Sequence, residues 1–520
     1  MKYLLAIDAG TGSIRAVLFD VKGNQIEVSQ QEWTHKEEKN VPNSMSFDYD
    51  NNWTKVCDCI QEVIRKSKIN AENILALSAT SMREGIVLYD KNQKELWAVA
   101  NVDARASKEV KFLNKEFQDL ENKCYKESGQ TFALGAIPRI LWLKNNKAKT
   151  YEKVQFVSMI SDWVLAKLSN VIATDPSNAG TTGIFNLKKR KWSPKMAKKV
   201  GLKDNIFPNV LETGEVLGNV TSEASFETGL SQSTLVVMGG GDVQLGSAGL
   251  GVTKLNDCAI IGGSFWQQIV NIKKHVQPPN DISVRVNPHV IKNQSQAEGI
   301  TFFSGLVLRW FRDAFCQYQK EKAKRMNIDT YALLENMASK VPVGSYGIMP
   351  IFSDEMKYGK WYHAAPSFLN LNIDSEVCNI ASMFRSLQEN AAIVSNINLL
   401  KIEKFSKTKF KTITFAGGAS KGKLWPQILA DVTGKKVKIP VVKEATALGA
   451  AMSAGVGAGV YKDLNSAAKK VVKFEKVINP NMKNFKIYKK ITKNWQKAYS
   501  KQLELVDENI TTSMWKAPGI

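Results

Sequence analysis

The sequence predicts an α/β protein made of two related halves that face each other across a ligand-binding cleft. The chain has 520 residues, more than the roughly 250 to 300 at which a single hydrophobic core stops growing. Short β-rich runs that end in glycine alternate with amphipathic segments, a pattern typical of α/β folds. The opening plan of strand, glycine turn and strand over residues 4–20 returns over residues 257–270. We therefore expect two domains, 1–251 and 252–520, called here the first half and the second half.

Individual elements follow from the same periodicity. Residues 4–8 and 14–20 are expected to form strands on either side of the turn 9–13, and together they predict a hairpin. Residues 161–168 predict a helix that follows a strand. Further strands are expected at 74–79, 96–100, 154–159, 235–238, 412–416 and 437–439. The lysine-rich runs at 188–191 and 469–493 are interpreted as a hairpin and as surface helices.

Composition excludes several classes of protein. Hydrophobic residues make up 44% and charged residues 23% of the chain, as in ordinary folded proteins. The N-terminal apolar run reaches Asp8 before a secretory signal could form, and no run is long enough to span a membrane. The six cysteines have no spacing suited to zinc, and the four histidines form no spaced set. We expect a cytoplasmic protein with structural thiols.

The net charge of +22 raises the question of a nucleic-acid partner. Sixty of the 71 basic residues are lysines, whereas arginine is the usual fork for bases and phosphates. The excess is also spread along the chain. A solvated, lysine-rich surface is therefore favoured over nucleic-acid binding, and an acidic protein partner stays open.

Two glycine-rich segments resemble nucleotide-binding motifs, but each lacks a feature that the motif requires. Residues 417–424 have the spacing of a Walker A loop, but Leu424 stands where a magnesium-binding Ser or Thr is needed. Residues 455–459 end an apolar helical run instead of opening a helix after a strand, so they do not form a dinucleotide fingerprint. Neither segment predicts a phosphate loop by itself.

Two other strand ends combine glycines with a carboxylate. Asp8 precedes a turn with free amides and two hydroxyls, Thr11 and Ser13, which suits a nucleotide phosphate and its magnesium. Asp242 follows three glycines at the expected N-terminus of a helix. A simple helix cap is the alternative for Asp242, with about even odds.

Arg83 and Glu84 are adjacent and follow a strand that should be buried. Such a pair can bind the hydroxyls of a polyol or sugar, with arginine donating hydrogen bonds and glutamate accepting them. A structural ion pair is an equally good interpretation. Asp103 and Arg105 supply a second carboxylate and guanidinium after the strand 96–100.

Taken together, these motifs resemble the FGGY carbohydrate kinases of the actin-like ATPase superfamily, almost from end to end. The segments 8–15 and 262–264 resemble the two phosphate loops of the family, 417–420 its adenosine loop, and Gly241-Asp242 its catalytic-base segment. Asn101 departs from the tryptophan that the family carries two residues before Asp103. The resemblance implies two actin-like (ribonuclease H-like) domains with an interdomain cleft.

The resemblance also implies roles for individual residues, with ATP and Mg²⁺ as cofactors. Asp242 would be the catalytic base, Asp8 would orient magnesium through water, and Arg15 would neutralise charge on the transferred phosphoryl group. The residues expected to bind ATP are Asp8, Thr11, Gly12, Ser13, Arg15, Gly263, Ser264 and Gly418. Those expected to bind the substrate are Arg83, Glu84, Asp103, Asp242, Gln244 and Trp266.

Within the family, the segments 81–87, 175–182 and 240–246 are most similar to kinases of a quorum-sensing signal, the one derived from 4,5-dihydroxypentane-2,3-dione. Two alternatives stay open: a kinase of another pentulose or polyol, and an actin-like switch ATPase that is not a kinase. The resemblance further suggests a phosphocarrier protein of the sugar phosphotransferase system as a partner, and a homodimer.

Overall fold

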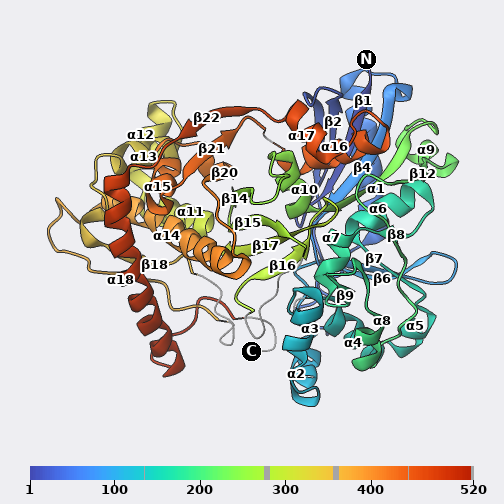
Figure 1. Cartoon of the computed structure of the whole chain (residues 1–520), viewed down its shortest axis with the longest axis horizontal. Coiled ribbons are helices and arrows are strands. Elements are labelled where there is room, and N and C mark those ends of the chain that lie inside the picture. Colours follow the sequence, from blue (N-terminus) through green and yellow to red (C-terminus); the bar gives the residue numbers. More distant parts are fainter. Residues whose placement is uncertain (134, 275–281, 355–361, 443, 517–520) are drawn as a thin grey trace.

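A computed structural model describes residues 1–133, 135–274, 282–354, 362–442 and 444–516. Two twisted sheets, one in each half, carry helices on their faces (Figure 1). The sheet of the first half has the order β12 (Val216–Asn219), β13 (Leu235–Gly241), β4 (Ile74–Ser81), β1 (Tyr3–Ala9), β2 (Ser13–Asp20), β3 (Gln25–Glu32). That of the second half has the order β16 (Arg285–Pro288), β17 (Gln294–Thr301), β15 (Trp266–Lys273), β14 (Cys258–Gly262), β20 (Thr412–Ala416), β21 (Lys436–Pro440), β22 (Phe474–Ile478).

The two sheets share one topology. In the first, β1 pairs antiparallel with β2, which pairs antiparallel with β3, while β4 and β13 run parallel to β1 and β12 closes the edge antiparallel. In the second, β14, β15 and β17 form the same meander, β20 and β21 run parallel to β14, and β22 closes the edge. The repeat of the opening hairpin thus marks a repeated fold. In both halves the parallel strands end at one edge, where ligands bind in open α/β sheets.

Helices cover these sheets. Those of the first half are α1 (Tyr49–Ser67), α2 (Ser107–Glu116), α3 (Leu120–Ser128), α4 (Ala136–Asn146), α5 (Ala148–Lys153), α6 (Ile160–Ser169), α7 (Pro176–Ala179), α8 (Pro194–Lys199), α9 (Ser222–Thr228) and α10 (Asp242–Gly249). Those of the second half are α11 (Ser304–Phe315), α12 (Gln317–Arg325), α13 (Thr330–Ala338), α14 (Ile380–Ser406), α15 (Leu424–Thr433), α16 (Ala445–Gly457), α17 (Leu464–Val471) and α18 (Met482–Asp507).

A smaller unit is inserted between β4 and β13. Its three-stranded sheet has the order β6 (Glu95–Val99), β5 (Ile86–Tyr89), β7 (Phe156–Met159), and it has an apolar core of its own with α2 and α4. Short two-stranded ribbons complete the fold: β8 (Ala173–Thr174) with β11 (Asn209–Val210), β9 (Phe185–Asn186) with β10 (Lys191–Trp192), and β18 (Met349–Ile351) with β19 (Ser367–Leu369).

Two helices, α10 and α16, lie against each other where the halves meet. A Cβ on Gly249 would stand 1.9 Å from the carbonyl oxygen of Ala445, and one on Gly449 would stand 2.0 Å from that of Leu245. Only glycine permits backbones to approach so closely. This contact fixes Asp242, the first residue of α10, relative to the second half.

The last part of the chain returns to the first half. Apolar residues of α16 and α17 pack with those of β1, β2 and β4 in one cluster, and Figure 1 shows these red helices beside the blue strands. The boundary at residue 251 stays a prediction, because a segment beyond it completes the core of the first sheet.

Most predicted elements agree with the structure, including the opening hairpin, the ribbon around residues 188–191 and the helix end at 455–459. One interpretation was wrong: residues 474–478, inside a run expected to form surface helices, are the edge strand β22. Lys476, the one lysine of β22, is opposite Ile439 in the ladder with β21, so tertiary pairing decided this segment.

Candidate active site

A cavity of about 720 Å³ opens at the strand edge of the second half. It brings together the loop after β14 (Gly262, Gly263, Ser264) and the loop after β20 (Gly418), as expected for the two segments assigned to ATP. These loops meet because β14 and β20 are parallel neighbours. Gly417 has a φ of +93°, and a Cβ there would lie 2.4 Å from the carbonyl oxygen of Gly262, so the contact requires glycine.

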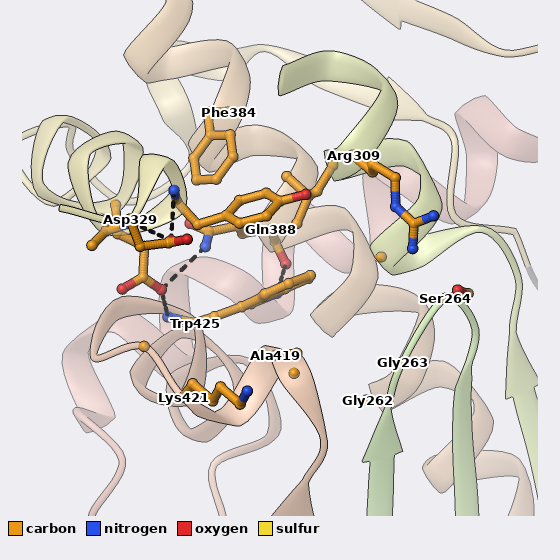
Figure 2. Close-up of a pocket in the computed structure, with 17 residues that line it drawn as sticks. Gly262, Gly263, Ser264, Arg309, Asp329, Phe384, Gln388, Ala419, Lys421 and Trp425 are labelled. Atoms are coloured by element: carbon orange, nitrogen blue, oxygen red, sulfur yellow. Dashed lines mark hydrogen bonds between the residues drawn. The ribbon is translucent and has the colours of Figure 1, made fainter. Parts of the chain in front are cut away.

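The walls of the cavity differ in character. Figure 2 shows the rings of Phe384 and Trp425 on one side and the guanidinium of Arg309 on the side of Ser264. Glu335 holds the loop after Gly418: its carboxylate accepts the backbone N–H of Lys423 at 3.1 Å and of Trp425 at 3.4 Å. The cavity thus has an apolar end suited to a base and a cationic end beside a phosphate loop.

The first phosphate loop lies at the corresponding edge of the other sheet. Asp8 ends β1 with its side chain 13% exposed, and Arg15 Nη1 lies 4.0 Å from Asp8 Oδ2. Burial raises the pKa of Asp8 to about 7; Arg15 lowers it, whereas Asp242 and Glu444 raise it further. Asp8 thus lies within electrostatic reach of carboxylates from two other elements, Asp242 of α10 and Glu444 before α16.

Loop residues 11–13 have few polar partners. Thr11 Oγ1 accepts a hydrogen bond from Asn101 Nδ2 at 3.1 Å, and the carbonyl of Gly12 accepts the N–H of Trp33 at 3.2 Å. The side chain of Ser13 makes no hydrogen bond to any residue that the structure describes. The Ser13 hydroxyl is therefore available to a phosphate, whereas a phosphate at Thr11 Oγ1 would have to replace the contact with Asn101.

Arg15 is held by protein partners. Its Nε donates to Gln30 Oε1 at 2.9 Å, and its Nη1 donates to Glu444 Oε2 at 3.1 Å. By contrast, Arg309 makes no hydrogen bond or ion pair with any other described residue. Arg309, which the sequence reading missed, is thus the guanidinium that an anion could reach without breaking an ion pair.

Asp242 is the first residue of α10, and Gly241, not Asp242, is the N-cap. Its Oδ1 accepts the N–H of Val243 at 2.7 Å and lies 3.7 Å from Arg83 Nε. Its Oδ2 accepts no hydrogen bond from the described residues, and the side chain is 39% exposed. Burial raises the pKa of Asp242, Arg83 opposes this shift, and Glu298 and Glu84 add to it. A carboxylate with one uncommitted oxygen suits a general base better than a helix cap.

Arg83 and Glu84 are both ion-paired across the halves. Arg83 Nη1 donates to the two carboxylate oxygens of Glu298 at 2.7 and 3.0 Å, and Arg285 Nη2 donates to Glu84 Oε1 at 2.6 Å. Burial acts to lower the pKa of Arg83, but Glu298 and Asp242 outweigh it and raise that pKa. For Glu84, Arg285 and Arg83 outweigh burial and lower the pKa. The ion-pair interpretation thus describes both side chains, and the binding of polyol hydroxyls stays a prediction.

Asp103 does not belong to this group, and its assignment to the substrate is corrected. Its side chain is fully buried; Oδ2 accepts the N–H of Met45 at 2.6 Å and Arg105 Nε at 2.8 Å. Arg105 in turn lies beside the stacked rings of Trp97 and Trp142, with its guanidinium carbon 5.2 and 4.9 Å from their centroids. Asp103 neutralises a buried cation in the inserted unit.

Trp266 is likewise no pocket wall. Its side chain is fully buried in the core, with ring centroids 5.0 Å from Phe415 and 4.7 Å from Trp425. Successive residues of a strand point to opposite faces, so the next residue, Gln267, faces the ion pairs and donates from Nε2 to Glu298 Oε2 at 3.0 Å.

Gln244 is placed near the site but contacts protein. It is fully buried, and its Nε2 donates to Glu298 Oε1 at 2.7 Å. Its role here is to hold Glu298. Sequence reading missed Glu298, Gln267 and Arg285; a lone glutamate within the strand 294–301 was the available signal for Glu298, but its partners lie far away in sequence.

No group of three or more metal-ligating side chains occurs in the described part of the chain. Magnesium commonly uses one or two carboxylates together with nucleotide phosphates, and Asp8 at the phosphate loop fits such a site. The described helices also include none with the length and apolar character to cross a membrane.

Comparison with known proteins agrees with this geometry. The model of the N-terminal domain of the FGGY family of carbohydrate kinases matches residues 3–249, and the C-terminal model matches residues 269–458. Proteins called autoinducer-2 kinase from Enterobacter sp. (strain 638) and from Yersinia enterocolitica are 54% and 53% identical, each over 100% of this chain and 98% of the relative.

Solved structures share the fold at lower identity. A xylulose kinase from Lactobacillus acidophilus superimposes with a TM-score of 0.83 at 20% identity, covering 98% of this chain and 99% of its own. A glycerol kinase with ADP from Plasmodium falciparum gives 0.82 at 20% identity, with 97% and 98% covered. The predicted two-domain actin-like fold is confirmed, and the chain belongs to the FGGY family of carbohydrate kinases.

Proposed function

We propose that this kinase transfers the γ-phosphoryl group of ATP to the terminal hydroxyl of 4,5-dihydroxypentane-2,3-dione, giving phospho-autoinducer-2. Full-length relatives at 53–54% identity that are named for autoinducer-2 support the choice of acceptor. The observation that carries the chemistry is the Asp242 carboxylate, which keeps one oxygen uncommitted beside Arg83 and Glu84 and near Asp8.

In this mechanism the protein supplies positioning and charge stabilisation, as phosphoryl transfer requires. Asp242 accepts the proton of the acceptor hydroxyl through Oδ2 as that oxygen attacks the γ-phosphorus. The contribution of such a base is typically ~10²- to 10⁴-fold. Arg83 and Glu84 orient the neighbouring oxygens of the acceptor.

The nucleotide lies between the two phosphate loops in this proposal. Backbone and hydroxyl groups of Thr11, Gly12, Ser13, Gly263 and Ser264 hold the phosphates, and Gly418 lets adenosine approach the backbone. Asp8 would hold magnesium through water, and the bound ion would supply positive charge to neutralise the phosphates. Arg309 is better placed than Arg15 to stabilise negative charge, because Arg15 already bonds Gln30 and Glu444.

The remaining expectations stay predictions. They are a cytoplasmic enzyme, a phosphocarrier protein of the sugar phosphotransferase system as regulator, a homodimer, and exclusion of water by closure of the halves. A kinase for another pentulose or polyol is the second candidate, because pocket residues alone decide among the members of one fold.

The test is kcat/KM for ADP release with ATP and magnesium, measured for the dione, xylulose, ribulose, ribitol and glycerol. The proposal expects the dione to exceed each alternative by at least about tenfold. Preference for a pentulose or polyol would replace the acceptor while keeping the kinase assignment. ADP release that ignores every acceptor would contradict the kinase mechanism itself.

A further inference from the structure

The ion pairs of Arg83 and Glu84 are reciprocal. Two successive residues of the first half, one cationic and one anionic, meet an anion and a cation of the second half. Those partners, Glu298 on β17 and Arg285 on β16, are directly opposite each other in the antiparallel ladder. The four side chains, here called the charge quartet, therefore alternate in sign and join both halves.

Glu298 is the most buried member, with a side chain 1% exposed against 9% for Arg83. Both of its oxygens receive additional donors, Gln244 Nε2 at 2.7 Å and Gln267 Nε2 at 3.0 Å. A buried carboxylate with this many donors has one orientation, and removing it would leave Arg83 with only the longer contact to Asp242, at 3.7 Å, as an ion pair among the described residues. Glu298 thus fixes where the guanidinium of Arg83 lies.

Glu84 is directed at the second half by its backbone. Its φ of +73° is in the left-handed region, which a non-glycine residue adopts only when its surroundings enforce it. Arg139 donates to the carbonyl of Glu84, and Arg285 holds its side chain. Arg285 Nε and Nη2 also donate to Gln130 Oε1 at 2.8 and 2.6 Å.

The strand that carries Arg285 is itself fastened to the first half. The N–H of Val286 donates to the carbonyl of Gly129 at 2.9 Å, and Asn287 Nδ2 donates to the carbonyl of Ser177 at 2.7 Å. The quartet is therefore continuous with an ordered contact between the halves.

We propose that Glu298 and Arg285 are positioning residues for the acceptor, so that the second half takes part in acceptor recognition through Arg83 and Glu84. The inference deepens the proposed function and rests on it. Within the described residues, Arg83 Nη2 and Glu84 Oε2 make no hydrogen bond. The pair with Glu298 occupies Nη1 of Arg83, and the pair with Arg285 occupies Oε1 of Glu84, which leaves Nη2 and Oε2 for acceptor oxygens.

The test compares Glu298→Gln with Glu403→Gln. Glu403 is a matched control, since it is also a buried carboxylate of the second half and accepts Lys435 Nζ at 2.8 Å, where β21 begins. Glu298→Gln should raise the acceptor KM and the calorimetric acceptor Kd by about tenfold or more, with the ATP KM within about twofold. Glu403→Gln should change neither constant, although both variants lower the melting temperature.

Arg285 supplies a second, independent pair of variants. Arg285→Gln should raise the acceptor Kd. Arg285→Lys should raise it less, because lysine keeps the positive charge but lacks the several N–H donors of the guanidinium. Should Glu298→Gln fail to fold, this pair decides. If the wild type phosphorylates the acceptor but Glu298→Gln or Arg285→Gln leaves the acceptor KM and Kd unchanged, the inference is overturned while the proposed function stands. A wild type that neither binds nor phosphorylates any acceptor would overturn the inference together with the proposed function.

Discussion

The nucleotide cavity and the acceptor region recognise their ligands in different ways. The cavity is lined by the second half alone, through glycine backbone, aromatic rings and two cations, Arg309 and Lys421, that make no ion pair with another described residue. The acceptor region consists of charged side chains from both halves that already bond one another. Shape and backbone thus select ATP, whereas a network assembled on folding selects the acceptor. Substitutions should separate these two modes.

The largest effect is expected on the chemical step, from a substitution that should leave the binding of both ATP and the acceptor unchanged. Asp242→Asn should lower kcat by about 10²- to 10⁴-fold, because the amide cannot accept the acceptor proton. ADP release in single-turnover experiments measures this step, and nucleotide titration provides the control. Near-normal turnover in a folded variant would remove Asp242 from the role of base.

A change confined to the cavity should affect ATP only. A Cβ at Gly418 meets no protein atom within 4 Å, so Gly418→Ala should leave the melting temperature unchanged while the added methyl group obstructs adenosine. We expect the ATP KM to rise by about tenfold and the acceptor KM to stay constant. Gly417→Ala is the contrast, since its φ of +93° and its contact with Gly262 predict a loss of stability as well. An ATP KM that is unaffected by Gly418→Ala would place adenosine elsewhere.

The phosphate loop of the first half should show itself in the pH dependence of stability. The pKa of Asp8 is raised from 3.8 to about 7, so the folded state binds more protons than the unfolded state between these values. The free energy of unfolding therefore falls as pH rises through this window. Asp8→Asn should melt a few degrees higher than the ligand-free wild type at pH 8, with a smaller difference at pH 5 and little difference at pH 3. If Asp8→Asn and the wild type had equal melting temperatures at every pH, the pKa of Asp8 would not be raised in the folded protein.

The smallest kinetic effect is expected at Asp103, which tests its removal from the acceptor site. Asp103→Asn removes one of the two carboxylates that pair with the buried Arg105 guanidinium and leaves the other, Glu38 Oε2, at 2.9 Å. The free energy of unfolding should therefore fall by about 2 kcal/mol. The acceptor KM of the protein that remains folded should match that of the wild type. Chemical denaturation and steady-state kinetics check the two parts, and an increased KM would return Asp103 to the site.

How much of this was predictable depends on how local each signal is. The hairpin at residues 3–20 and the glycines before Asp242 are readable because a few neighbouring residues specify a turn or a strand end. The same holds for Gly263 and Gly418. Side-chain partners were not readable, because Arg83 and Glu298 are 215 residues apart in sequence and meet only after the halves pack.

Trp266 and Asp103 illustrate the limit. Both faces of β15 are covered by protein, so the alternation of apolar and polar residues does not show which face is the core. It could not tell that Trp266 enters the core and that Gln267 faces the quartet. Asp103 lies close in sequence to a guanidinium, as a binding residue could, but both side chains of this pair are fully buried, beside the rings of Trp97 and Trp142. Burial separates a binding carboxylate from a structural one, and burial is a tertiary property.

The central claim is that Asp242 and the charge quartet direct phosphoryl transfer to an organic acceptor. Its most direct test is phosphorus and proton NMR of a reaction that contains the protein, ATP, magnesium and 4,5-dihydroxypentane-2,3-dione. The account predicts a phosphate ester on the terminal oxygen of the dione, formed in equal amount with ADP. Release of ADP with inorganic phosphate and no ester would contradict it and identify an ATPase.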